Sequence, residues 1–156
     1  MGDVSLAQSY LIDAIKQVIE PLVGPLVGDP DGFDAVNLEV GCEIDFRGCI
    51  RGQLRLSMSL GAAQAMGRAI LNQDTPLHSE DLADVVCEVT NLVAGSTKTR
   101  LGLANAEISL PRLTIDHGGS QRSTAADETH RYRFASGLLL AEMTIEPERC
   151  QEETEL

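Results

Sequence analysis

The sequence predicts an α+β fold in which helices cover one face of a mostly antiparallel sheet. Three observations lead to this prediction. The chain has 156 residues, which is the usual size of one domain. Its apolar residues alternate with polar ones in some stretches and recur at helical spacing in others. These stretches follow one another as a helix, a strand pair, two helices and further strands, without an internal repeat.

The first helix is predicted over residues 4–22, and Pro21 fits near its end. Its apolar residues recur at helical spacing: Leu11, Ile12, Ile15, Val18, Ile19 and Leu22. The Gly-, Pro- and Asp-rich residues 24–32 then predict a loop. Aspartates in such a loop invite calcium, but the full ligand pattern of a calcium loop is missing, so we expect no metal there.

A β-hairpin is predicted next. Apolar and polar residues alternate over residues 36–44, which is typical of a half-buried strand. Residues 50–60 predict a second strand, whose alternation slips near Gly52. Arg47 and Gly48 are suited to the turn between the two strands, which should therefore pair.

Two helices follow the hairpin. Residues 61–71 carry apolar side chains at helical spacing and predict a short helix. Residues 79–101 predict a long one. Ser79 can cap the free amides at its start, and Glu80 and Asp81 favour the positive end of the helix dipole.

The last third of the chain predicts three more strands. Residues 106–115 form the first, in which Pro111 causes a bulge or occupies an edge position. Residues 116–130 are polar and rich in Gly, Ser and Thr, which indicates a mobile loop. A short strand around residues 132–134 and a final strand at 138–145 complete the fold.

Composition limits how the chain can be organised. Residues 147–156 are rich in Glu, so we expect an acidic, disordered tail after a single domain at residues 1–146. The chain is 43% hydrophobic and 23% charged, which excludes disorder throughout. Aromatic residues make up only 3% and Trp is absent, so the core must be aliphatic.

The charge of the chain excludes several kinds of partner. There are 12 Lys and Arg against 24 Asp and Glu, which gives a net charge of −12. This charge argues against binding to nucleic acid or to an anionic membrane. The scarcity of aromatic rings also argues against base stacking. An acid near the N-terminus and the lack of a long apolar run predict a cytoplasmic protein without membrane insertion.

Cysteines and histidines show no metal-binding pattern. No two cysteines form a C-x-x-C pair or a zinc-like array with a His, so we expect reduced thiols packed as small hydrophobic groups: Cys42, Cys49, Cys87 and Cys150. The histidines lie in or near predicted loops, where we expect them at the surface: His78, His117 and His130.

The long helix separates an apolar face from a set of polar residues. Its apolar residues form one stripe that should pack against the sheet: Leu82, Val85, Val86, Val89, Leu92 and Val93. On a helical wheel, Asp84, Glu88, Asn91 and Gly95 fall within a narrow arc on the opposite side, and Lys98 continues it. We call these five residues the polar ridge.

An ordinary solvated face also places polar residues on the outside of a helix. Two members of the polar ridge favour a function beyond that. Asn91 is a mediocre helix former, and Gly95 costs up to about 1 kcal/mol relative to Ala in a helix interior. Because a glycine lets another backbone approach closely, the polar ridge can serve as a docking edge.

Residues 88–95, Glu-Val-Thr-Asn-Leu-Val-Ala-Gly, resemble the E-x-x-N-(M/L)-(I/V)-A-G signature of the CheX-type chemotaxis phosphatases, which are relatives of CheC and FliY. The resemblance extends over about residues 4–146 and includes further stretches: Gly52–Met58, Ala69–Leu71 and Leu110–Leu113 with Gly118. A single E-x-x-N motif resembles CheX more than CheC, which usually carries two. Residues 96–98 depart from the family, in which Asn often follows the Gly.

This resemblance implies a CheC/CheX-like fold and a hydrolase activity, namely removal of phosphate from the aspartyl phosphate of a CheY-like response regulator in two-component signalling. By position, Glu88 and Asn91 match the catalytic residues of the family, and Asp84 matches an acidic or Ser position before that Glu. Asp84, Gly95 and Lys98 are then expected to bind the partner. The resemblance also implies a homodimer, no metal or cofactor of its own, and Mg²⁺ on the partner.

The residue types suit this chemistry. An acyl phosphate already has a good leaving group, so the reaction mainly needs a well-placed water. The carboxamide of Asn91, inserted into the site of the partner, would hold that water in line with the breaking bond, as a glutamine does in small GTPases. Glu88 would pair with a cationic side chain beside the phosphoryl group and fix the docking register.

Two alternatives belong to other classes of protein. The first is a non-catalytic binding module that uses the same ridge to bind a response regulator or a flagellar or chemotaxis component. The presence of both Glu88 and Asn91 favours the catalyst, since a pure scaffold does not need the pair. The second is a small-molecule hydrolase, which no nucleophile elbow or Gly-rich phosphate loop supports.

Overall fold

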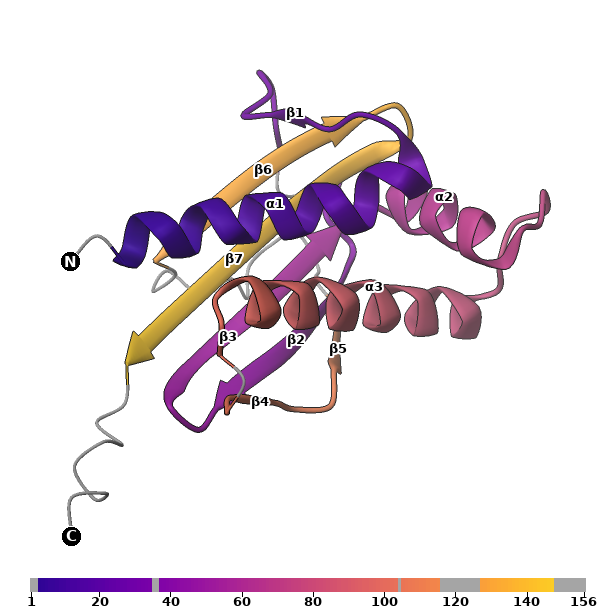
Figure 1. The fold of residues 1–156 in the computed structure, drawn as a ribbon. Helices are drawn as coiled ribbons and strands as arrows, with labels where there is room; N and C mark the ends of the chain where they lie inside the picture. Colours follow the sequence, from indigo (N-terminus) through magenta and orange to yellow (C-terminus); the bar gives the residue numbers. More distant parts are fainter. Residues whose placement is uncertain (1–2, 35–36, 104, 116–126, 148–156) are drawn as a thin grey trace, which may run out of the picture.

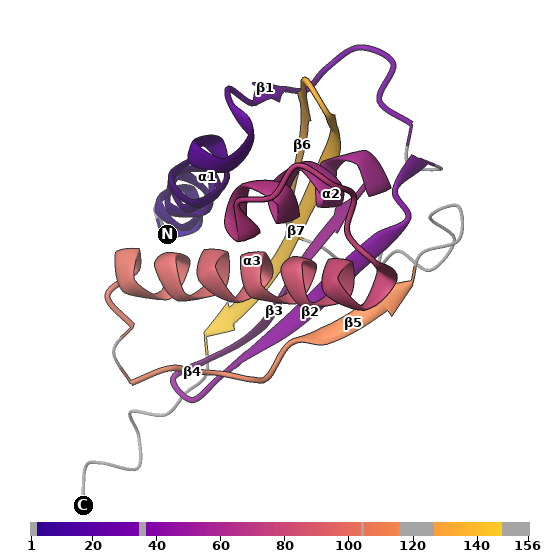
Figure 2. The ribbon, with the colours of Figure 1, turned by 90° about the vertical axis from the view of Figure 1, so that its right-hand side faces the viewer.

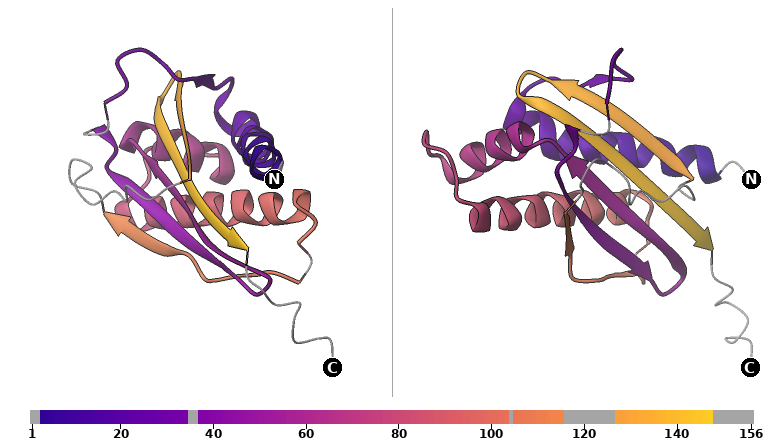
Figure 3. Two further views of the ribbon diagram at one scale, coloured as in Figure 1. Left: turned by 90° about the vertical axis from the view of Figure 1, so that its left-hand side faces the viewer. Right: turned by 180° about the vertical axis from the view of Figure 1, so that it is seen from behind.

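The chain folds into two layers, a β-sheet and a set of helices on one of its faces (Figure 1). A computed structural model describes residues 3–34, 37–103, 105–115 and 127–147. The helices in these ranges are α1 (Asp3–Val23), α2 (Leu60–Leu71) and α3 (Ser79–Arg100). Seen from behind, the strands lie in front of the helices (Figure 3). The predicted α+β arrangement is therefore confirmed.

The sheet is antiparallel at each of its strand pairs. Its order is β1-β6-β7-β3-β2-β4, and β5 also pairs with β2. The strands are β1 (Val27–Gly28), β2 (Val40–Arg47), β3 (Ile50–Met58), β4 (Glu107–Ile108), β5 (Arg112–Ile115), β6 (Glu128–Phe134) and β7 (Gly137–Pro147). The short strand β1 lies within the predicted loop 24–32, where it pairs with β6.

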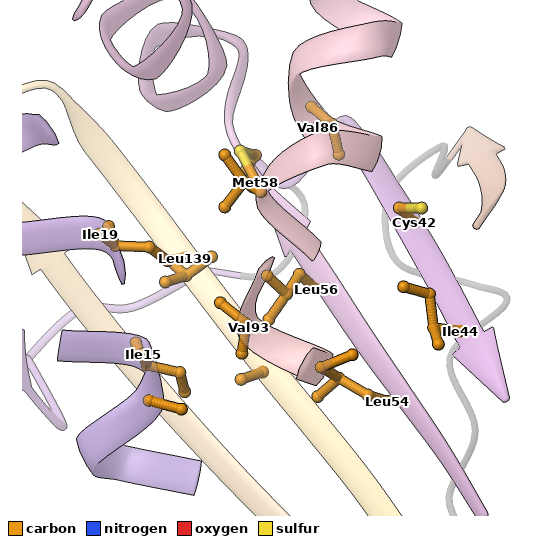
Figure 4. Close-up of a cluster of buried hydrophobic side chains, with 14 of the residues drawn as sticks. Ile15, Ile19, Cys42, Ile44, Leu54, Leu56, Met58, Val86, Val93 and Leu139 are labelled. Carbon is orange, nitrogen blue, oxygen red and sulfur yellow. The ribbon is translucent and has the colours of Figure 1, made fainter. Parts of the chain in front are cut away.

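The core lies between the sheet and the helices, and it is almost entirely aliphatic. Alternate residues of the central strands face the helices and are fully buried: Cys42, Ile44, Leu54, Leu56 and Met58. Helix α3 crosses β2 and β3 (Figure 2), and α1 lies beside α3, over β6 and β7 (Figure 1). Figure 4 shows Ile15 and Ile19 of α1, Val86 and Val93 of α3, and Leu139 of β7 gathered around the same cluster.

The predicted hairpin forms, with β2 shifted toward the turn. Its register runs from Val40 opposite Met58 to Phe46 opposite Gly52. β2 covers residues 40–47 rather than 36–44. The slip in the second strand has a physical cause, because a Cβ atom at Gly52 would collide with the backbone oxygen of Thr144 in β7. The glycine permits the close approach of β7.

The predicted strand 106–115 is split into β4 and β5, which both pair with β2. Pro111 lies between them, at the edge of the sheet, because proline has no N–H to donate. Ser109 attaches the segment between β4 and β5 to β2. Its N–H donates to the backbone oxygen of Asp45 at 2.9 Å, and its Oγ accepts from the N–H of Asp45 at 2.9 Å.

The C-terminal strands are longer than predicted. β6 begins at Glu128, so part of the predicted loop 116–130 is strand; residues 116–126 lie outside the described residues, as do residues 148–156 of the predicted tail. The surface prediction for His130 is wrong. Its side chain is 12% exposed, and its Nε2 lies 3.2 Å from Oε1 of the buried Glu128. His78 is exposed, as predicted, and His117 lies outside the described residues.

We predict that Leu56→Ala lowers the free energy of unfolding by about 2–5 kcal/mol, because it leaves a cavity in a fully buried site. Leu113→Ala is the matched control, since both leucines lie opposite Cys42 in β2 and Leu113 is 43% exposed. Its effect should stay within about 0.5 kcal/mol, as for an ordinary surface change. Urea unfolding measures both values, and equal losses would contradict the assignment of the core.

Candidate functional site

Helix α3 carries the polar ridge, and its two ends differ in how they are capped. His78 occupies the N-cap position and its side chain makes no capping hydrogen bond, so the prediction that Ser79 is the cap is wrong. The C-terminal end is closed by two backbone bonds. The N–H of Gly102 donates to Thr99 at 3.0 Å and that of Leu103 donates to Lys98 at 3.1 Å. Gly102 has a φ of +70°, which a glycine adopts without strain.

The buried face of α3 combines valines with threonines: Val85, Val86, Val89, Thr90, Val93, Ala94 and Thr97. The hydroxyl groups of Thr90 and Thr97 donate to the backbone oxygens of Val86 and Val93, each at 2.8 Å. Because their polar atoms are satisfied within the helix, the threonines pack as apolar residues do. Leu92, which the predicted stripe included, is 45% exposed instead.

The polar ridge lies on the opposite side of α3. Asp84 and Glu88 are exposed, and Asn91, Gly95 and Lys98 are half-buried. Within the described ranges, the side chains of Glu88 and Asn91 make no hydrogen bond or ion pair. The structure therefore brings the predicted site residues to one surface of one helix and leaves the carboxylate and the carboxamide free for an external group.

Asn91 opens into a groove of about 630 Å³ that runs along α3. Residues of α1 and β4 complete the groove, whose lining is Gln17, Asn91, Leu92, Gly95, Ser96, Thr99, Arg100 and Ile108. We call it the Asn91 groove. Gln17 and Ile108 were missed by the sequence analysis. They belong to other elements, α1 and β4, so no pattern within α3 could have indicated them.

Gly95 has no packing reason to be a glycine. A Cβ atom added there would meet no atom within 4 Å. Gly67 in α2 is the opposite case, since its added Cβ would lie 2.5 Å from Cδ2 of Leu77 and 3.2 Å from Cγ2 of Val85. The fold requires a small residue at Gly67. At Gly95 the space is left open toward the outside of the protein.

A second polar cluster lies on the face of the sheet that the helices do not cover, and its members satisfy one another. Arg112 donates to the Asp45 carboxylate at 2.9 and 3.0 Å and to that of Glu43 at 3.3 Å. These hydrogen bonds from Arg112 lower the pKa of Asp45 below its ordinary value, although burial of the carboxylate acts in the opposite direction. Arg55 lies 3.7 Å from Glu43. Since these charges are compensated internally, we interpret the cluster as structural.

The described ranges contain no group of three or more His, Cys, Asp or Glu side chains that could hold a metal ion. None of the helices in these ranges combines the length and the apolar character needed to cross a bilayer.

Several solved structures have the same fold. The chemotaxis protein CheX from Vibrio vulnificus has a TM-score of 0.74 and 18% sequence identity, over 90% of this chain and 99% of that chain. A chemotaxis protein CheX from Desulfovibrio desulfuricans has a TM-score of 0.68 and 18% identity, again over 90% of this chain and 99% of that chain.

A third similar structure is a complex of CheX with CheY, BeF3 and Mg²⁺ from Borrelia burgdorferi. Its TM-score is 0.64 and its sequence identity 15%, over 88% of this chain and 96% of that chain. Identities this low establish the shared fold alone.

Comparison of the sequence itself assigns the family. No match to the chain is found among curated proteins. The sequence model of the family described as "Chemotaxis phosphatase CheX" matches residues 40–135, which is more than half of the chain and includes β2 to β6. With the E-x-x-N motif on the exposed side of α3, the chain belongs to the CheX family of chemotaxis phosphatases.

Proposed function

We propose that this protein hydrolyses the aspartyl phosphate of a CheY-like response regulator, with Asn91 positioning the attacking water. One observation carries the proposal: Glu88 and Asn91, the two residues of the family motif, face outward from α3 without a partner among the described residues. The complex of CheX with CheY from Borrelia burgdorferi supports a regulator of this type as the partner.

The reaction breaks the bond between phosphorus and the aspartate oxygen, and a water oxygen forms the new bond to phosphorus. The carboxylate is a good leaving group and the transition state is loose, so a strong base is not needed. The oxygen of the Asn91 carboxamide accepts a hydrogen bond from the water and holds it in line. Positioning of this kind lowers the activation barrier by several kcal/mol, as it does for other well-oriented reactants.

Glu88 lies one turn before Asn91 on the polar ridge and is exposed. We infer that its carboxylate pairs with a cationic side chain of the regulator, beside the phosphoryl group. A charge pair there fixes the register in which Asn91 enters the site. The Mg²⁺ belongs to the regulator, as the composition of the CheX–CheY complex suggests, and this chain then needs no metal ligand of its own. Asp84, Gly95 and Lys98 form the remaining contact surface.

The alternative is a binding module that engages the regulator through the same ridge without hydrolysis. Phosphate release from a phosphorylated regulator, measured with catalytic amounts of this protein, separates the two functions. Multiple turnovers support the phosphatase, whereas binding without turnover would favour the module.

We also propose a homodimer, which sedimentation velocity tests directly.

Asn91→Ala should reduce the stimulated dephosphorylation about 100-fold or more, because an unheld water is no longer in line with the breaking bond. Binding of the regulator should change little. The rate is measured as phosphate release and the binding by titration with the phosphorylated regulator. A variant that releases phosphate as fast as the parent would remove Asn91 from the mechanism.

Glu88→Ala should weaken binding about tenfold, and added salt should weaken the parent in the same direction because both remove an electrostatic attraction. Asp31→Ala is the matched control. It removes the same charge from an exposed residue that follows β1, the edge strand at the opposite end of the sheet from β4. Titrations at two salt concentrations compare them, and identical behaviour of both variants excludes a role for Glu88.

Gly95→Ala should stabilise the fold and impair docking. Alanine is better than glycine in a helix by about 1 kcal/mol, which corresponds to a rise in Tm of about 2–4 °C for a chain of this size. The added methyl group keeps the backbone of the partner away, so dephosphorylation slows. Gly67→Ala is the control: its methyl group contacts Leu77 and Val85, so Tm should fall while the rate of the folded protein is kept. A Gly95 variant with a higher Tm and full activity contradicts close docking at this position.

A further inference from the structure

Two thiols from different elements meet directly behind the polar ridge. Cys42 lies in β2 and Cys87 in α3, and their Sγ atoms are 3.4 Å apart although 45 positions separate them in the sequence. Both cysteines are free. A disulfide has a sulfur–sulfur distance of about 2.05 Å, so the two sulfur atoms have to approach by about 1.4 Å to form one.

The two thiols differ in how they are exposed. Cys42 is fully buried in the cluster of Figure 4, whereas Cys87 is half-buried. Burial and the hydrogen bond with Cys87 raise the pKa of Cys42 to about 12, so it is protonated at neutral pH. An oxidant therefore reaches Cys87 first, and Cys42 is in place to react with the product.

Charge limits which oxidants can reach Cys87. Glu88 is the next residue and Asp84 lies one turn earlier, both exposed, and the whole chain has a net charge of −12. Anionic oxidants such as glutathione disulfide are repelled by this surface. Small neutral hydroperoxides are not.

We propose that Cys42 and Cys87 form an oxidisable dithiol site for hydroperoxides, and that closing the disulfide ties α3 to β2. The sulfur of Cys87 attacks a peroxide oxygen, the O–O bond breaks, and the thiol proton leaves with the other oxygen as water or an alcohol. Cys87 is then a sulfenic acid. The sulfur of Cys42 attacks it, the S–O bond breaks, and the proton of Cys42 leaves with the hydroxide as water. The two thiols lose two electrons to the peroxide.

The disulfide acts on the polar ridge because α3 is the element that moves. β2 is held on both sides, by β3 along one edge and by β4 and β5 along the other. Closing the gap therefore pulls the turn of α3 that contains Cys87 toward the sheet. Glu88 follows directly and Asn91 lies one turn further on, so both are displaced. The effect on activity rests on the proposed function, whereas formation of the bond does not.

Peptide mapping tests the bond itself. Trypsin places each cysteine on a separate peptide, with Cys42 in residues 17–47, Cys49 in 48–51 and Cys87 in 69–98. After treatment of the reduced protein with hydrogen peroxide, mass spectrometry should find the peptides 17–47 and 69–98 linked. Cys87→Ser should abolish the link and Cys49→Ser should keep it. Glutathione disulfide should give far less of it. Absence of the linked peptide from the parent overturns the proposal.

Activity and hydrogen exchange test the coupling to α3. In the oxidised protein, dephosphorylation should fall by about tenfold to a hundredfold, because a misplacement on the order of 1 Å has effects of this size, and dithiothreitol should restore it. Amide exchange of residues 84–95 should slow when the bond closes. A linked protein with unchanged rate and unchanged exchange refutes the coupling. If the reduced protein has no phosphatase activity, the proposed function fails, and the linked peptide and the exchange still decide the dithiol site.

Discussion

Burial of the valine and threonine face of α3 against the sheet determines where the rest of this helix points. A helix on a sheet has one rotation that hides most of its apolar residues. Rolling α3 by one position would expose a buried valine, at a cost of about 1.5–3 kcal/mol for each such side chain. Thr90 and Thr97 do not disturb this preference, since each hydroxyl bonds to its own helix. The orientation of Asn91 is thus set by contacts that lie on the other side of the helix.

Two groups of charged side chains among the described residues differ in whether their charges are compensated. On the uncovered face of the sheet, Asp45 and Glu43 are compensated by Arg112 and Arg55. On the polar ridge, Asp84 and Glu88 are exposed and form no ion pair with a described residue. Uncompensated carboxylates create a negative potential, which attracts a partner with a cationic rim. A cluster of charges that is neutralised internally has no such effect.

The fold, and the placement of Glu88 and Asn91 on the side of α3 away from the core, could be predicted from the sequence because both depend on local periodicity. The period-two alternation in β2 and β3 and the helical spacing in α3 reflect which side chains are buried, and a motif of residues within two turns of one helix needs no tertiary information. The buried stripe predicted for α3 included Leu92, which is 45% exposed, and did not include Thr90, which is fully buried. Polarity alone could not reveal that a threonine hydroxyl bonds within its own helix.

Features that depend on contacts between distant elements could not be predicted. The division of residues 106–115 into β4 and β5 depends on where β2 offers hydrogen bonds on either side of Pro111. The Cys42–Cys87 contact joins a strand and a helix whose relative position no spacing rule gives. His130 was expected at the surface because it follows a polar stretch, yet it lies in β6 opposite Ala141 of β7, and its side chain is 12% exposed.

The two ends of α3 are capped differently, and the N-terminal end is a position where the helix can be stabilised. The C-terminal end is already closed by Gly102 and Leu103, but at the N-terminal end His78 has the backbone geometry of a cap without its hydrogen bond. A Ser or Asp in place of His78 would supply that bond and typically adds about 1 kcal/mol. Because this position precedes the first turn and lies outside the polar ridge, a thermostable variant could be built there while the polar ridge keeps its native sequence.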